Sequence, residues 1–224
     1  MFKTETHLHT AEVSTCSKIR AKEMIRRYHD AGYSTVFVSD HFQTNTLDSL
    51  GDIPWCDKVA IFLSGYYKAK VEGEKIGMNV LPAAEICFSD ASNHYIVYGV
   101  TKELLVRYPN IHKLTVKEFS NIAKENGLFV VQAHPHRDGS CFPTPEYIDA
   151  IEVYNSNPRH EDYSELSEKI AAEYNIPVSS GSDAHREEDI ARGGIITEFE
   201  IKTVEDFIAA VKERKLNIFK GEDK

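Results

Sequence analysis

The chain has 224 residues, of which 42% are hydrophobic and 27% are charged, and this composition suits one globular domain with a substantial core. A formal net charge of -9 disfavours binding to long duplex nucleic acid or to an anionic membrane, because both partners attract a basic face. The four cysteines form no CxxC pair and no apolar run reaches the length of a membrane span, so we expect a reduced, cytoplasmic protein without a disulfide framework.

Short apolar runs alternate with helical patterns along the chain. Strands are predicted at its start and over 34–40, 79–85, 94–100, 128–135, 148–155 and 176–185. Helices are predicted over 18–31, 56–76, 115–127, 161–174 and 203–215. This alternation indicates a mostly parallel α/β sheet in a single domain over residues 1–224, and the number of units favours a barrel over an open sheet.

The stretch THLHT places His7 and His9 two positions apart at the end of the first predicted strand. Alternate residues of a strand project to the same face, so the two imidazoles are expected to point in parallel. Taken alone, the pair fits a solvent-facing edge more readily than a metal clamp. Its meaning therefore depends on what the other strand ends carry.

Ligand-type side chains also follow other predicted strands. His41 comes after VFVSD, Glu85 after VLPAA and His134 after LFVVQA, whereas Asp183 and His185 come after IPVSSGS. In parallel α/β folds the carboxyl ends of the strands share one face, where active sites are built. The fold is therefore expected to bring these residues together.

His94 differs, because it stands at the beginning of its predicted strand. That strand is therefore expected to run against the others or to be irregular. Imidazoles with carboxylates suit zinc, iron or manganese in a catalytic centre. Eight ligand candidates imply two to three ions, with Glu85 or Asp183 as a bridge.

The motifs THLHT, SDH, AAE, NH, AHPH and SGSDAH, in this order, resemble the PHP (polymerase and histidinol phosphatase) superfamily over residues 4–197. The resemblance implies a distorted (β/α)7 barrel, similar to a TIM barrel, with a trinuclear metal site at the C-terminal ends of the strands. It also implies phosphoester hydrolysis. The ligand groups that the resemblance implies are His7, His9, Glu85 and Asp183 for one ion, Glu85, His94 and His134 for a second, and His41 and His185 for a third.

The sequence departs from the family pattern shortly after the HxH pair. Many members carry Asp or His there as a further ligand of the third ion, whereas this chain reads TAEVSTCSK. Glu12 is the nearest carboxylate and is the expected replacement, with Cys16 as the alternative. Without either side chain the third position would be incomplete.

Substrate contacts are expected from the loops on the active face, because a guanidinium group suits phosphate. Arg192 is the first choice, since the flanking Gly193 and Gly194 would let the backbone approach closely. His136 follows the HP turn and is a further candidate. The other candidate arginines are Arg159, Arg137 and Arg186.

Three other polar residues have weaker signals. Asp40 is either the acceptor that orients a ligand imidazole or a plain loop carboxylate. His29 and His112 are predicted to be surface residues.

These patterns predict a metal-dependent phosphoesterase that acts on a small phosphorylated substrate. A metal-bound hydroxide is the expected nucleophile, with no single protein base assigned. One alternative is an amidohydrolase-type enzyme acting on a C–N bond, and such enzymes commonly use a carbamylated lysine as the bridge. The other is a non-catalytic metal-binding PHP module. Histidinol phosphate, a sugar phosphate, a nucleotide and a short oligonucleotide all stay open as substrates, as do the metal identity and the oligomeric state.

Overall fold

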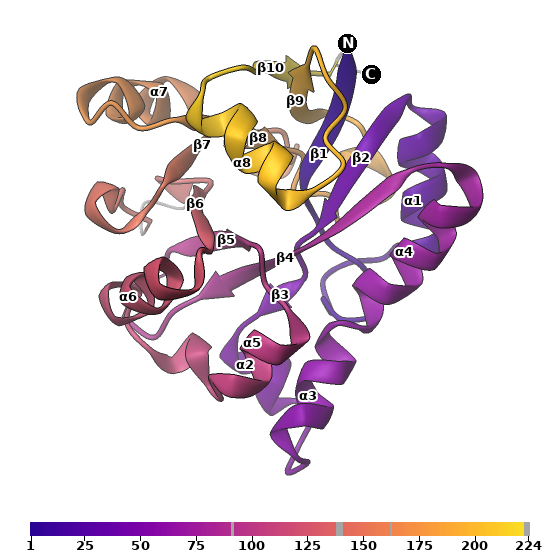
Figure 1. The fold of residues 1–224 in the computed structure, drawn as a ribbon, viewed down its shortest axis with the longest axis vertical. Helices are drawn as coiled ribbons and strands as arrows, with labels where there is room; N and C mark the ends of the chain where they lie inside the picture. Colours follow the sequence, from indigo (N-terminus) through magenta and orange to yellow (C-terminus); the bar gives the residue numbers. More distant parts are fainter. Residues whose placement is uncertain (91, 138–140, 162, 222–224) are drawn as a thin grey trace.

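The computed structural model describes residues 1–90, 92–137, 141–161 and 163–221. Ten strands among these residues form one sheet in the order β10-β9-β1-β2-β4-β5-β6-β7-β8, with β3 beside β4 (Figure 1). The strands are β1 (Phe2–Leu8), β2 (Tyr33–Val38), β3 (His41–Phe42), β4 (Asn79–Cys87), β5 (His94–Tyr98), β6 (Phe129–Ala133), β7 (Ala150–Asn155), β8 (Val178–Gly181), β9 (Gly193–Thr197) and β10 (Asn217–Lys220).

The helices surround this sheet. They are α1 (Ala21–Asp30), α2 (Thr44–Asp48), α3 (Trp55–Phe62), α4 (Ser64–Ile76), α5 (Lys102–Arg107), α6 (Val116–Asn126), α7 (Ser164–Glu173) and α8 (Val204–Lys212). In the part of the chain that the structure describes, no helix has the length and apolarity needed to cross a membrane.

The sheet closes almost completely into a barrel. Strands β1, β2 and β4 are parallel neighbours, as are β6, β7 and β8. Strand β5 runs antiparallel to both β4 and β6, which confirms the reversal predicted from the position of His94. Strand β8, at one end of the sheet order, comes back beside β1. There the Thr6 hydroxyl donates to the carbonyl of Ser180 at 2.7 Å, and Leu8 pairs with Ala184 just beyond β8. The distorted (β/α)7 barrel implied by the resemblance is confirmed.

Glycines allow the strands to meet closely at this junction of β8, β1 and β9. A Cβ added to Gly193 would lie 2.6 Å from the carbonyl oxygen of Gly181. One added to Gly194 would overlap the carbonyl oxygen of Thr4, and one added to Gly181 would overlap the Cβ of His7. The junction therefore depends on residues without side chains.

Aromatic side chains fill the interior of the barrel. Phe207 of α8 enters it and contacts the rings of Phe37, Tyr98 and Phe129. Tyr98 ends the antiparallel β5 and Phe129 begins β6, so α8 covers the end of the barrel away from His94. Outside the sheet, α1 and α4 pack their apolar residues on β1, β2 and β4.

Two expectations about individual segments are wrong. The helix predicted over 56–76 is divided at Leu63 into α3 and α4. Just after this break Gly65 packs directly on Thr10, where a Cβ would overlap the threonine hydroxyl. His112, predicted to be a surface residue, is 1% exposed and lies between the rings of Phe42 and Trp55. Within the helix predicted over 161–174, residue 162 lies outside the described residues.

Candidate metal centre

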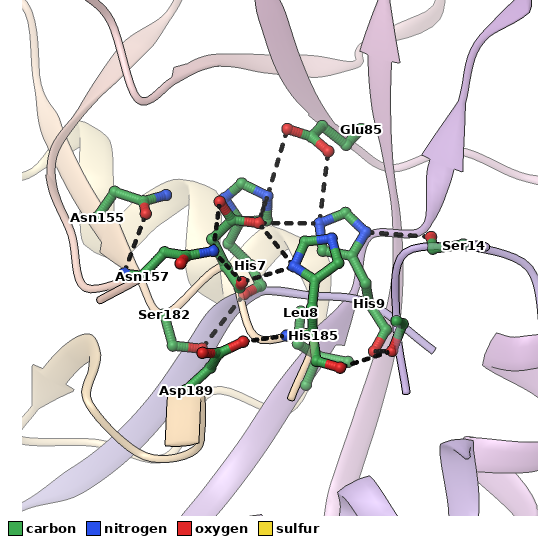
Figure 2. A network of polar contacts seen from close by, with 12 residues as sticks. His7, Leu8, His9, Ser14, Glu85, Asn155, Asn157, Ser182, His185 and Asp189 are labelled. Carbon is green, nitrogen blue, oxygen red and sulfur yellow. Dashed lines mark hydrogen bonds and ion pairs between the residues drawn. The ribbon is translucent and has the colours of Figure 1, made fainter. Parts of the chain in front are cut away.

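The fold brings the eight histidine, aspartate and glutamate candidates into one cluster. Each lies at the same end of the barrel, although they are spread over nearly the whole chain. Figure 2 shows His7, His9 and His185 converging, with Glu85 facing them from β4. The cluster consists of His7, His9, His41, Glu85, His94, His134, Asp183 and His185.

The carboxylate of Glu85 occupies the middle of the cluster. Its Oε1 lies 2.9 Å from Nδ1 of His94 and 3.0 Å from Nε2 of His134. Its Oε2 lies 2.6 Å from Nδ1 of His41 and 3.4 Å from Nε2 of His9. One carboxylate thus contacts imidazoles from four separate segments, the arrangement that a bridging metal ligand needs.

Asp183 faces the HxH pair from the opposite side. Its Oδ1 lies 3.5 Å from Nε2 of His7 and 3.3 Å from Nε2 of His9. Its Oδ2 accepts a hydrogen bond from Arg137 at 2.8 Å, and the second amino group of that arginine donates to Asn155 at 2.8 Å. Arg137 therefore fixes the orientation of Asp183 toward the histidines.

His41 and His185 form the third part of the cluster together with Cys16. The two Nε2 atoms are 3.4 Å apart, and the Cys16 side chain hydrogen-bonds to both imidazoles. Burial raises the pKa of the Cys16 thiol, but the hydrogen bonds to His185 and His41 outweigh this effect and lower it to about 6. The thiol is therefore in a setting that favours the thiolate.

The donor atoms fit transition-metal ions. Nε2 of His7 and Nε2 of His9 are fully buried and have no hydrogen-bond partner among the described residues, while both point at carboxylate oxygens. Buried polar atoms without partners are costly unless a ligand satisfies them. Four groups of three donors lie within 4.8 Å of one another: His7, His9 and Glu85; His7, His134 and Asp183; His41, Glu85 and His94; and His9, His41 and His185.

Burial disfavours charge throughout the cluster, but its members perturb one another more strongly. Burial opposes protonation of His7, yet the neighbouring carboxylates, Asp183 first, raise its pKa well above the usual value. Burial likewise opposes ionisation of Glu85, yet the surrounding imidazoles, His94 first, hold its pKa well below the usual range. For His9, burial and the neighbouring imidazoles lower the pKa well below its usual value. These directions favour the ionised carboxylate of Glu85 and the neutral imidazole of His9, the forms that bind metal ions.

Two ligand candidates have strained backbones. His134 and Asp183 both adopt positive φ angles, 28° and 51°. A positive φ angle costs free energy in residues other than glycine. Such strained residues are common at functional sites, where surrounding contacts hold the conformation. For His134 one such contact is the hydrogen bond from its backbone N–H to Glu152 at 2.8 Å.

Glu152 is a supporting residue that the sequence analysis missed. Its Oε1 lies 3.0 Å from Nδ1 of His7, and its Oε2 accepts from Asn155 at 2.9 Å as well as from His134. The signal was present in IEVYN, where a charged residue interrupts a buried strand. Asn157 of the following loop was also missed, and its side chain donates to the carbonyl of Asp183.

Asp40 holds the loop that follows β1. It accepts hydrogen bonds from the backbone and hydroxyl of Thr10 and, at 2.8 Å, from the hydroxyl of Ser14. Ser14 in turn lies 3.2 Å from Nδ1 of His9. Asp40 therefore orients a ligand imidazole through a serine rather than directly.

Glu12, the expected replacement ligand, lies away from the cluster. Its Oε2 accepts a hydrogen bond from the backbone N–H of Ala21 at 2.8 Å, at the start of α1. Its Oε1 lies 3.8 Å from Nζ of Lys68. The expectation is wrong because the unpaired N–H groups of a helix N-terminus take this carboxylate.

A cavity of about 410 Å³ opens onto the cluster. Arg137, Arg159 and Arg186 line it, together with Cys16, His41, Glu85, His94, His134, Asn157, His160, Asp183 and His185. Arg159 is held by Asp189, which it contacts with both of its amino groups. Arg186 is less engaged, since its Nη1 lies 3.9 Å from Oε1 of Glu188 and 46% of its side chain is exposed.

Arg192 and His136 are not among the described residues that line this cavity. The position of Arg192 gives no support to its expected role, because Gly193 and Gly194 belong to β9 and serve the close strand packing. The carbonyl of Arg192 accepts a hydrogen bond from the N–H of Gly221 at 2.8 Å. His136 has a positive φ of 73°, and burial lowers its pKa.

Comparison with known families gives a match in the C-terminal part of the chain. A family described as PHP-associated matches residues 163–216, the segment that runs from α7 through α8 and carries Asp183 and His185. No curated protein matches the chain by sequence.

Solved structures match nearly the whole chain. A two-domain protein from Bacteroides vulgatus, containing a predicted PHP-like metal-dependent phosphoesterase, is 16% identical with a TM-score of 0.72 over 98% of this chain. The lesion-specific endonuclease EndoQ from Pyrococcus furiosus is 16% identical with a TM-score of 0.61 over 97% of the chain. The chain spans 65% of the first protein's length and 57% of the second's.

A third similar structure is an amidohydrolase from Chromobacterium violaceum with bound sulfate and no metal. It is 13% identical with a TM-score of 0.56 and covers 99% of both chains. At these identities the three likenesses show the fold. The PHP-associated match over residues 163–216 and the barrel shared with a PHP-like structure agree with the resemblance seen in the histidine and carboxylate motifs.

Proposed function

We propose that the protein is a metal-dependent phosphoesterase that hydrolyses a small phosphoester at a centre of two to three zinc, iron or manganese ions. The observation that carries this proposal is the position of Glu85, whose two carboxylate oxygens face different imidazoles of the cluster. Adjacent ions that share a carboxylate can stabilise both the attacking and the leaving oxygen at phosphorus.

Some residues of the site are proposed to bind the ions, and others hold those ligands in position. Ions bound there would supply an activated water nucleophile and neutralise charge on the phosphoryl oxygens. Glu85 and Asp183 present ionised carboxylates to them. Arg137 holds Asp183 from behind, and Glu152 holds His7, so both ligands are fixed before substrate arrives.

Arg186 is the proposed phosphate-binding arginine. It lines the cavity, and its side chain is less committed than those of Arg137 and Arg159, which are held by Asp183 and Asp189. A phosphate held by ions on one side needs donors on its other oxygens, and a planar guanidinium provides two. The cavity of about 410 Å³ suits a small phosphorylated substrate rather than long duplex nucleic acid.

An amidohydrolase activity is the second candidate, favoured by the likeness to the Chromobacterium violaceum enzyme. A carbamylated lysine would then be expected at the bridge. No lysine lines the cavity among the residues that the structure describes, and Glu85 takes the central place. This composition supports phosphoester hydrolysis over cleavage of a C–N bond.

Metal-reconstituted protein assayed on a panel of phosphomonoesters, phosphodiesters, short oligonucleotides and amides tests the proposal. Turnover of at least one phosphoester is expected, with Glu85→Gln inactive and Glu12→Gln active as the matched control. Glu12 is a suitable control because it caps α1, outside the cluster. Turnover of amides alone would favour the amidohydrolase. A fully metal-loaded protein that turns over nothing on the panel would favour a non-catalytic metal-binding module.

A further inference from the structure

We propose that Cys16 binds the third metal ion together with His41 and His185, so that this position of the centre selects a thiophilic metal. The proposal rests on the proposed function only in that both use the same centre. It concerns a residue type that the family pattern does not provide, since the pattern has Asp or His at this point.

The first observation is where the chain puts the thiol. Cys16 lines the cavity together with His41 and His185, and its side chain interacts with both imidazoles. The Nε2 atoms of these two histidines lie 3.4 Å apart. At that separation one nitrogen can donate to the other only when the two tautomers differ, whereas an ion between the two lone pairs would satisfy both nitrogens at once.

The second observation is independent of the cysteine. Nε2 of His9 is fully buried and has no hydrogen-bond partner among the described residues. A ring nitrogen of His9 also lies within 4.8 Å of donor atoms of His41 and His185. The ring of His9 is 4.2 Å from that of His41 and 4.1 Å from that of His185, centroid to centroid. A buried imidazole in the same donor group as His41 and His185 therefore borders the position proposed for this ion.

The backbone of the loop holds the thiol there. The hydroxyl of Ser17 donates to the carbonyls of His9 and His185, at 3.2 and 3.3 Å. The N–H of Lys18 donates to the carbonyl of His185 at 2.8 Å. The residues on the C-terminal side of Cys16 are thus tied to two histidines of the cluster, while Glu12 is engaged with α1.

A thiolate changes which metal the position prefers. Cysteine binds zinc, iron or cobalt in preference to the harder manganese or magnesium, which carboxylates suit better. The thiol proton is released to solvent when the metal binds. One position of the centre is therefore expected to keep a thiophilic ion when the others are filled with manganese.

Cobalt substitution tests the proposal without using activity. Metal-free full-length protein reconstituted with Co²⁺ should show a near-ultraviolet sulfur-to-cobalt charge-transfer band. Cys16→Ser should lose the band, whereas Cys56→Ser, a change at an exposed cysteine of α3, should keep it. Cys87→Ser is the decisive comparison, because Cys87 pairs with His94 across β4 and β5. A band that survives in Cys16→Ser, or disappears only in Cys87→Ser, overturns the proposal.

Alkylation of the wild-type protein provides a second readout that needs no variant to fold. Iodoacetamide should modify Cys16 in chelator-treated protein and be slowed at least tenfold by stoichiometric Zn²⁺, as followed by peptide mass spectrometry. Equal alkylation with and without Zn²⁺ overturns the proposal. Failure of the proposed function is distinct, because it would appear as a cobalt–thiolate band in a protein that hydrolyses no phosphoester.

Discussion

Glu152 lies 3.0 Å from Nδ1 of His7, behind the ring, while Nε2 of the same ring faces Glu85 and Asp183. The carboxylate can therefore accept a hydrogen bond from Nδ1–H, which leaves Nε2 unprotonated and free to bind a metal ion. In Glu152→Gln an amide nitrogen would replace one of two oxygens that together accept three hydrogen bonds. We expect metal affinity to fall by roughly 10- to 100-fold, measured by competition with a chromophoric chelator. Glu165→Gln on α7 is the control, and equal affinity in both variants would count against the role of Glu152.

Asp183→Ala and His134→Ala should each remove a side chain that is proposed to bind a metal ion directly. Wild-type protein prepared without chelator is expected to carry at least two transition-metal ions by elemental analysis, and each variant should carry fewer. Phosphoesterase turnover should fall by more than about a hundredfold, beyond what supporting residues cost. Circular dichroism should stay close to that of the wild type, because the barrel core is built from other residues. Near wild-type turnover under limiting metal would contradict these assignments.

Glu12→Gln should affect stability rather than metal content. Glu12 satisfies the N–H of Ala21 at the start of α1, so the free energy of unfolding is expected to fall by about 0.5–2 kcal/mol in urea titrations. Elemental analysis of the same preparation should show an unchanged number of ions. If the Glu12→Gln variant bound one ion fewer than the wild type, Glu12 would have to be assigned as a metal ligand.

Arg186→Ala should lower turnover by roughly a hundred- to a thousandfold with unchanged metal content, the cost typical of one lost charge-stabilising group. Arg192→Ala is the matched control, since Arg192 does not line the cavity and its carbonyl is bound by Gly221. Steady-state kinetics on the best phosphoester of the panel would decide. A larger loss of turnover in Arg192→Ala than in Arg186→Ala would show that Arg192 is the arginine that binds phosphate.

His112 predicts a pH effect that is separate from the metal centre. Burial, followed by the charge of Lys113, lowers the pKa of His112 from 6.5 to about 4. Between these values the unfolded chain binds a proton that the folded chain does not, so the contribution of His112 makes the protein less stable as pH falls. The loss approaches about 3 kcal/mol at the bottom of this window. Urea titrations between pH 4 and pH 7 should show a weaker acid destabilisation in His112→Phe, and parallel profiles would refute the effect.

Most of the barrel could be predicted because its parallel strands are short apolar runs that end in glycine or ligand residues. The position of His94 at the start of its strand even predicted the reversal of β5. Strands β9 and β10 were missed because GGIIT begins with two glycines, which indicate a loop when tertiary packing is not known. The same misreading made Arg192 the leading phosphate ligand.

The metal candidates could be found from strand ends alone, since the ends of parallel strands must meet. The supporting residues could not be found in this way. Glu12 shows the reason: its distance along the chain from His9 suggested a ligand, but a helix N-terminus competes for the same carboxylate. Whether a carboxylate binds a metal ion or a helix N-terminus depends on the three-dimensional position of both, which the spacing of residues in the sequence does not give.

The absence of a side chain at Gly181 has a consequence for how this scaffold can change. The backbone of Gly181 packs so closely on β1 that a Cβ added to it would overlap the Cβ of His7. Closure of the barrel and the placement of His7 therefore depend on the same missing side chain. A residue with higher strand propensity would strengthen β8 only by displacing His7, a proposed metal ligand. At this position β8 therefore stays weaker than it could be for as long as His7 keeps its place, whereas substitutions on outer helices such as α6 and α7 leave His7 undisturbed.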